Sequence, residues 1–142
     1  MEDFIVKKEI TIDSEPDKVW NALTNPELTK RYFFNCKVFS DWKPGSSITF
    51  KGRMFLIKKI EMNGKIIHVE PEKFLQYSLQ NKNSNTSSMV TDELIYENGK
   101  TTVRIMDDVG KGIHAEMRYD KSVKGWDKIL KGLKRVVENQ SV

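Results

Sequence analysis

Residues 88–107 read SMVTDELIYENGKTTVRIMD, and this stretch carries the strongest fold signal in the chain. Asn98 and Gly99 form the dipeptide most typical of a two-residue β-hairpin turn, because both residues tolerate positive φ. The flanking segments are rich in β-branched and alternating apolar residues, which predicts strands over 88–97 and 100–107. The other predicted elements can be arranged around this antiparallel hairpin.

Strands and turns continue upstream of the hairpin, back to residue 36. Polar or Gly/Pro-containing turns separate predicted strands over 36–42, 46–51, 54–70 and 73–80, and a polar loop covers 81–87. Gly52 and Arg53 are expected to form a tight hairpin turn. Asn63 and Gly64 interrupt the longest strand, either as a type I′ turn or as a bulge.

The chain begins with a predicted strand and two short helices, over residues 3–12, about 15–24 and about 26–33. Ser14 is a suitable N-cap for the first helix, and Asp17 can answer it as in a capping box. Asn25 is expected to cap the second helix, with proline at its first helical position.

A long helix is predicted over about 119–139, beginning near Asp120. Its apolar stripe consists of Val123, Trp126, Leu130, Leu133 and Val137, and its basic stripe of Lys121, Lys124, Lys128, Lys131 and Arg135. The basic stripe is typical of a solvated face, with contact to phosphates or an acidic partner as the alternative. Trp126 lies on the apolar side, whereas nucleic-acid-binding surfaces typically expose aromatic residues. No nucleic-acid partner is therefore expected.

The order of the elements predicts an α+β architecture in a single domain spanning residues 1–142. Sequential hairpins give an antiparallel sheet, whose apolar face must be covered. The long C-terminal helix is the largest apolar partner left, so the sheet is expected to curve around it. Side-chain volumes decide whether the space between them is filled or hollow.

Composition limits the class of protein. A chain of 142 residues, 38% hydrophobic and 31% charged with net charge +4, is expected to fold without crosslinks. It contains no apolar run long enough to span a membrane and no secretory signal. One cysteine and two histidines make a disulfide or a zinc site unexpected. Neither a metal nor a cofactor is expected, and the expected compartment is the cytoplasm.

Several different short motifs are spread over almost the whole chain, and their order and spacing are those of one protein family. They comprise Pro16, Val19, Trp20, Ala22, Leu23, Thr24, Pro26 and Glu27, then Lys43–Gly45, then Gly64, Ile66, Val69, Glu70, Pro71, Leu75 and Tyr77, then Val90, Thr91 and Leu94, then Thr102 and Ile105, and finally Gly125, Trp126, Ile129, Leu130 and Leu133. In these motifs, the chain resembles the START-like helix-grip (SRPBCC) superfamily. Within it, the chain resembles the homologues of the activator of the 90-kDa heat-shock protein's ATPase.

This resemblance implies a seven-stranded curved antiparallel sheet, two short helices after the first strand and a long C-terminal helix packed on the sheet. It implies that Asn63 and Gly64 form a bend within one strand. It also implies a small cytoplasmic protein that holds an apolar ligand between sheet and helix.

The candidate ligand-binding residues are those expected to point into that space: Phe34, Tyr77, Val90, Asp92, Ile105, Met117, Trp126, Ile129 and Leu130. Alternation along the strand places Asp92 inward with Val90, where its carboxyl would be a polar anchor or a general base. A bulge or register slip would instead place Asp92 in solvent, and Asp107 has the same ambiguity. Trp126 is either a wall of the pocket or a core residue that grips the sheet.

Three functions follow from these features. The first is a non-enzymatic binding protein for a lipid-like or aromatic small molecule. The second is an enzyme of the cyclase or hydratase kind, for which Asp92 and Asp107 are the candidate proton-transfer groups. The third is a protein-interaction module related to chaperone ATPase activation and the stress response, with an acidic partner at the basic helix face. The chain is expected to be a monomer or a weak homodimer.

Overall fold

The structure is a computed structural model that describes residues 4–54, 58–81 and 87–139. The elements, in chain order, are β1 (Ile5–Ile12), α1 (Pro16–Thr24), α2 (Pro26–Tyr32), β2 (Cys36–Ser40), β3 (Ser47–Met54), β4 (Lys58–Glu70), β5 (Phe74–Asn81), β6 (Ser87–Glu97), β7 (Lys100–Asp108) and α3 (Ala115–Asn139). The strands form one seven-stranded sheet in the order β1-β7-β6-β5-β4-β3-β2, and every neighbouring pair is antiparallel. The predicted helix-grip fold is confirmed.

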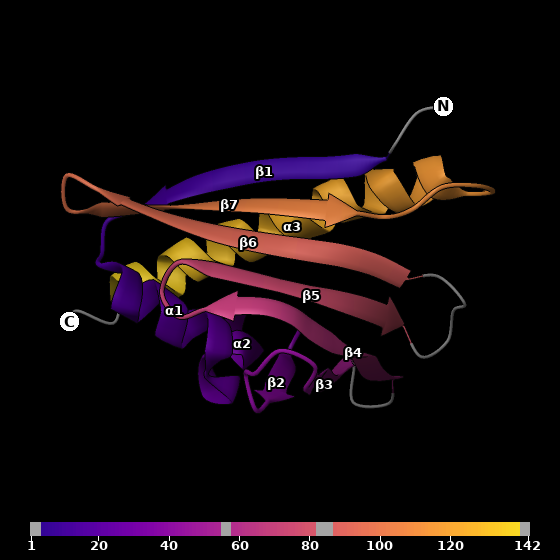
Figure 1. The fold of residues 1–142 in the computed structure, drawn as a ribbon, viewed down its shortest axis with the longest axis horizontal. Coiled ribbons are helices and arrows are strands. Elements are labelled where there is room, and N and C mark those ends of the chain that lie inside the picture. The colour runs from indigo at the N-terminus through magenta and orange to yellow at the C-terminus, as the bar shows by residue number, and fades with distance from the viewer. Residues whose placement is uncertain (1–3, 55–57, 82–86, 140–142) are drawn as a thin grey trace.

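The helices cover one face of the curved sheet. Figure 1 shows α3 running behind the sheet, with α1 and α2 near the strands at one edge. Four residues of the predicted apolar stripe of α3 are buried against the inner face, namely Trp126, Leu130, Leu133 and Val137. Val123 of that stripe is half-buried, and Ile129 is buried beside it. The other face of the sheet is turned to solvent, so the core lies between the sheet and α3.

Two glycines lie inside strands because their neighbours leave no room for a side chain. Asn63 and Gly64 continue β4 without a break, so both residues lie within one strand, as the resemblance implies, and the type I′ turn is not formed. A Cβ on Gly64 would collide with the backbone carbonyl of Ser78. The expected hairpin at Gly52 and Arg53 is wrong, because both residues continue β3, and a Cβ on Gly52 would collide with the Asn35 carbonyl.

The start of α1 differs from the predicted one, whereas the start of α2 does not. Glu15, not Ser14, is the N-cap of α1, and its side chain makes no capping hydrogen bond. The backbone of Ser14 is held instead by the turn after β1, since its N–H donates to Ile12 O and its carbonyl accepts from Thr101 Oγ1. Asn25 caps α2 as predicted, because its side chain accepts from the N–H of Glu27.

Helix α3 begins at Ala115, earlier than the expected start near Asp120. The Arg118 guanidinium donates to the backbone carbonyls of Val109, Lys111 and Ile113. These three hydrogen bonds join the preceding loop to the first turn, and the helix begins earlier than its amphipathic stripe alone indicates.

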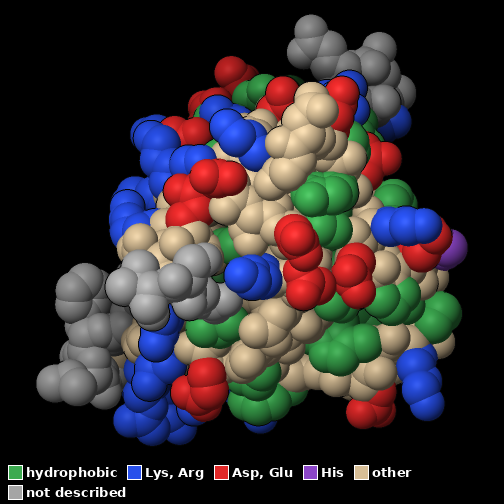
Figure 2. Space-filling view, turned by 90° about the vertical axis from the view of Figure 1, so that its left-hand side faces the viewer, with side chains coloured by type: hydrophobic (Ala, Val, Ile, Leu, Met, Phe, Trp, Pro, Cys, Tyr) green, Lys and Arg blue, Asp and Glu red, His purple; other side chains and the backbone are tan. Residues whose placement is uncertain are grey.

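The outward side of α3 carries charges of both signs. Figure 2 shows Lys and Arg side chains gathered on the left-hand side, where α3 lies, with Asp and Glu side chains among and beside them. The basic side chains of the predicted stripe are exposed. Asp127 lies among them and forms ion pairs with Lys8 and Lys131, with N–O distances of 3.5 and 3.8 Å.

Two glycines of α3 should respond in opposite ways to alanine. Alanine is about 1 kcal/mol more favourable than glycine inside a helix. A Cβ on Gly125 would meet Phe34 Cζ at an ordinary 3.5 Å, so Gly125→Ala should stabilise the protein by up to about 1 kcal/mol. A Cβ on Gly132 would lie 2.6 Å from Tyr32 Cβ, so Gly132→Ala should cost about 1–3 kcal/mol. Urea denaturation measures both changes, and stabilisation by Gly132→Ala would contradict the close packing of α2 on α3.

Candidate functional site

A small cavity lies between the inner face of the sheet and α3. Its volume is about 20 Å³, which is room for about one water molecule. Aromatic and aliphatic side chains make up most of its wall, among them Phe33, Phe50, Ile105, Ile129 and Leu133. The space that the sequence leaves undetermined is therefore almost filled in this structure.

The carboxyl of Asp92 belongs to this cavity. Asp92 is 3% exposed and lies opposite Leu75 on β5 and Ile105 on β7. The register of β6 is regular through these pairs, so the inward orientation is confirmed and the solvent-facing alternative is wrong. Among the described residues, none donates a hydrogen bond to this carboxyl. Burial raises its pKa from 3.8 to about 7, with a further contribution from the negative charge of Asp107.

Asp107 joins the sheet to α3. It is 6% exposed, and its Oδ2 accepts hydrogen bonds from Ser122 Oγ at 2.6 Å and Trp126 Nε1 at 2.8 Å. Its Oδ1 is buried and has no partner among the described residues. The inward reading of Asp107 is therefore confirmed. Trp126 combines both of its expected roles, because it lines the cavity and also anchors α3 to β7.

Two buried tyrosines complete a polar group around Asp92, and we call Asp92, Asp107, Tyr77 and Tyr32 the buried polar cluster. Burial raises the pKa of Tyr77 well above its ordinary value, and Asp92 and Asp107 add to the rise through their charge. Burial followed by the charge of Asp92 raises the pKa of Tyr32 as well. The Tyr32 hydroxyl donates to the carbonyl of Ala22 at 2.6 Å. Both phenols therefore remain protonated over the ordinary pH range.

Four rings form a continuous aromatic wall beside this cluster, namely Phe33, Phe50, Tyr77 and Trp126. Phe33 stacks on Phe50 with ring centroids 4.5 Å apart and meets Trp126 edge-on at 6.0 Å. Phe50 and Tyr77 lie 6.1 Å apart in a tilted arrangement. Such pairs pack favourably beyond the area that they bury.

The structure brings most of the predicted site residues together. The cavity is lined by Tyr77, Asp92, Ile105, Trp126, Ile129 and Leu130. Val90 is buried on the same face without lining the cavity. Phe34 and Met117 are 38% and 55% exposed and lie outside it.

The two displaced residues have separate causes. Phe34 follows α2 with a positive φ of 48°, which turns its ring across Gly125, and the neighbouring Phe33 takes the inward position. Met117 falls on the outer side of the first turn of α3, because that helix begins at Ala115. The site residues proposed from the sequence also leave out Tyr32 and Phe50, both of which line the cavity.

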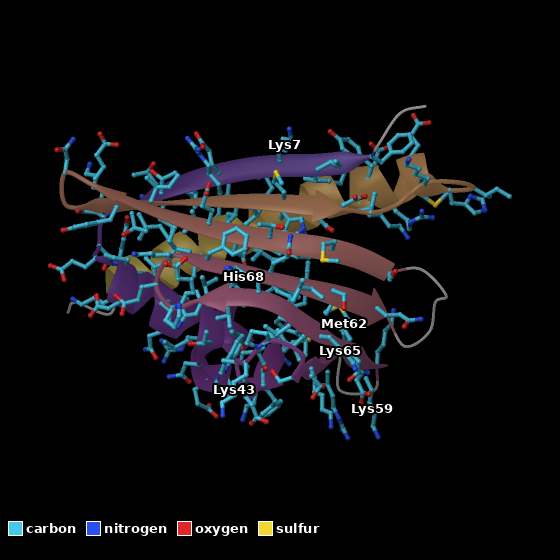
Figure 3. All side chains as sticks on the ribbon, in the orientation of Figure 1. Lys7, Lys43, Lys59, Met62, Lys65 and His68 are labelled. Carbon is cyan, nitrogen blue, oxygen red and sulfur yellow. The ribbon has the colours of Figure 1, made fainter. Side chains whose placement is uncertain are left out.

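The histidine on β4 lies away from the cavity. Figure 3 shows His68 on the sheet face turned toward the viewer, with α3 behind the sheet. Its ring meets Phe74 edge-on with centroids 5.2 Å apart.

Within the described ranges, no three His, Cys, Asp or Glu side chains are grouped closely enough to hold a metal ion. No helix in the described part of the chain is both long and apolar enough to cross a bilayer.

The raised pKa of Asp92 predicts a specific pH dependence of stability. The folded protein binds the Asp92 proton more tightly than the unfolded chain, so this residue removes stability as the pH rises from about 4 to about 7. Asp92→Asn should therefore resemble the parent protein near pH 4 and exceed its stability by a few kcal/mol near pH 8. Urea denaturation across this range measures the difference. Parallel pH profiles for the two proteins would contradict the buried, unpaired carboxyl.

Glu93→Gln is the matched control for this experiment. Glu93 is the next residue along β6, and its carboxyl is exposed on the opposite face of the sheet. The same change of carboxyl to amide there should leave the pH profile unchanged within about 0.5 kcal/mol.

Comparisons with known proteins agree with this geometry. The solution structure of ChR145 from Cytophaga hutchinsonii is 31% identical, with a TM-score of 0.78 and 99% of each chain covered. The crystal structure of NE0264 from Nitrosomonas europaea is 17% identical, with a TM-score of 0.81 and 96% of each chain covered. DynU16, from the dynemicin biosynthetic locus, is 20% identical with a TM-score of 0.81, over 98% of this chain and 49% of that one.

No curated protein matches the chain. The model of the family described as activator of Hsp90 ATPase homolog 1-like protein matches residues 13–138. The resemblance drawn from the sequence motifs is thereby confirmed. The chain belongs to the family of activator of Hsp90 ATPase homolog 1-like proteins.

Proposed function

We propose that this protein binds a small, largely apolar molecule between the sheet and α3, in contact with Asp92. The observation that supports this most is the Asp92 carboxyl, which is buried in an otherwise apolar cavity without a hydrogen-bond donor among the described residues. Burying a polar group without a partner costs free energy, so stability alone favours an apolar residue at this position. Strongly shifted carboxyl groups are concentrated at functional sites.

Binding requires the cavity to enlarge. Ligand pockets usually measure about 300–1,000 Å³, whereas this cavity measures about 20 Å³. Two of its lining side chains, Leu23 and Trp42, are half-buried and lie closest to solvent. Rearrangement of side chains on binding is common, and displacement of these two would extend the cavity toward the surface. The structure then corresponds to the closed form of the cavity.

Catalysis by Asp92 is the second candidate function. A carboxyl with a pKa of about 7 is suited to accept and return a proton near neutral pH. The likeness in fold to DynU16, from the dynemicin biosynthetic locus, supports small-molecule chemistry as a role for this fold. A cyclase or hydratase would use the same cavity, so a bound ligand is the first requirement of both functions.

The outward side of α3 offers less support for an acidic protein partner. Lys124 and Lys128 are exposed there, as such a partner requires. Asp127 lies between them and is paired with Lys8 and Lys131, which reduces the positive field of this surface.

Ligand binding can be tested with the protein purified from its own host and with a library of neutral apolar compounds. Native mass spectrometry should show a near-stoichiometric small molecule, or a library compound should raise the thermal stability. A ligand at one hundred times its Kd stabilises a protein by about 2.7 kcal/mol. This stabilisation should be lost or strongly reduced in Asp92→Asn and kept in Glu93→Gln. A protein free of bound molecules that no compound stabilises would refute the proposal.

A further inference from the structure

The charge balance around the cavity is incomplete. Asp92 and Asp107 place two carboxyl groups in the buried polar cluster. Among the described residues, no Lys, Arg or His side chain lines the cavity. The two donors from α3, Ser122 Oγ and Trp126 Nε1, both serve Oδ2 of Asp107. Oδ1 of Asp107 is buried without a partner among the described residues. No hydrogen bond among those residues reaches the Asp92 carboxyl, whose pKa is raised by burial and by the charge of Asp107.

The surrounding rings favour a positive charge rather than a neutral polar group. Trp126, Tyr77, Phe50 and Phe33 line the cavity that Asp92 faces. The face of an aromatic ring carries partial negative charge and attracts cations within about 6 Å of its centroid. Acidic and aromatic side chains together therefore make a site suited to one compact cation with several hydrogen-bond donors.

We infer that the ligand of this cavity carries a protonated amine, which donates to Asp92 and lies against the aromatic wall. The inference rests on the proposed function and names the chemical class of the ligand. An ammonium group is close in size to the single water molecule that the closed cavity can hold. It supplies three donors and a positive charge, whereas water supplies two donors and no charge. Asp107 favours the same cation through its charge.

Ionisation of Asp92 gives this site a characteristic pH dependence. Below its pKa of about 7 the carboxyl is neutral and cannot form an ion pair with an amine. The other titratable groups facing Asp92 are Asp107, Tyr77 and Tyr32, and the tyrosines stay protonated because their pKa values are raised. Amine affinity should therefore increase as the pH rises through about 7, and binding near that pH should release protons from Asp92.

The test compares benzylamine with benzyl alcohol, which share the ring and differ in the charged group. Isothermal titration calorimetry is run near pH 8 and near pH 5, and near pH 7 in buffers of different ionisation enthalpy. Benzylamine should bind at least about tenfold tighter than benzyl alcohol near pH 8 and lose at least about tenfold near pH 5. Proton release should accompany amine binding near pH 7. Methylammonium chloride, compared with sodium chloride in a thermal-shift assay, tests an amine small enough for the closed cavity.

Variants locate the effect within the protein. Asp92→Asn should abolish the preference for the amine and the proton release, whereas Glu93→Gln should keep both. Equal affinity for amine and alcohol, or binding of neutral library compounds only, would overturn the amine inference and leave the proposed function standing. Failure of every amine and every neutral compound to bind would refute the proposed function and the inference with it.

Discussion

The position of α3 on the sheet depends on one carboxylate oxygen. Oδ2 of Asp107 accepts hydrogen bonds from Trp126 and Ser122, which lie one turn apart on α3. Apolar packing alone would allow the helix to slide along the inner face, because hydrophobic contact is not directional. Two short hydrogen bonds to a buried charge fix the register, and they also place the Trp126 ring at the cavity. The site is therefore a consequence of how the helix is attached.

Apolar packing in the interior stabilises the fold, whereas the buried Asp92 carboxyl destabilises it when ionised. The aromatic wall and the aliphatic side chains of α3 bury apolar surface at nearly full packing. Asp92 opposes them, because its ionised form loses hydration and meets the charge of Asp107. Asp107 differs in that α3 supplies donors to one of its oxygens. Two acids on adjacent strands thus have separate positions: Asp107 attaches α3 to the sheet, and Asp92 lines the cavity.

Much of the fold could be predicted from short sequence patterns, because the tertiary contacts of the folded protein agree with the local structure that these patterns favour. The Asn98–Gly99 turn and the apolar stripe of α3 are such signals, and both are confirmed. Asp92 could not be oriented from alternation alone, because a single bulge reverses every later side chain in a strand. The exchange of Phe34 for Phe33 follows from a positive φ at a non-glycine residue, which the sequence does not indicate. Cavity volume depends on how all the side chains pack together, so it required the structure.

An open sheet has a further consequence for the interior. β1 and β2 are the two edge strands, and β2 is the shorter, with five residues paired only to β3. Detaching an edge strand breaks one ladder of hydrogen bonds, whereas separating central strands breaks the sheet. Ile48 and Phe50 of the cavity lie on β3, directly beside this edge. Fraying of β2 would therefore open the sheet directly beside the cavity, while the six strands from β1 to β3 in the sheet order stay paired.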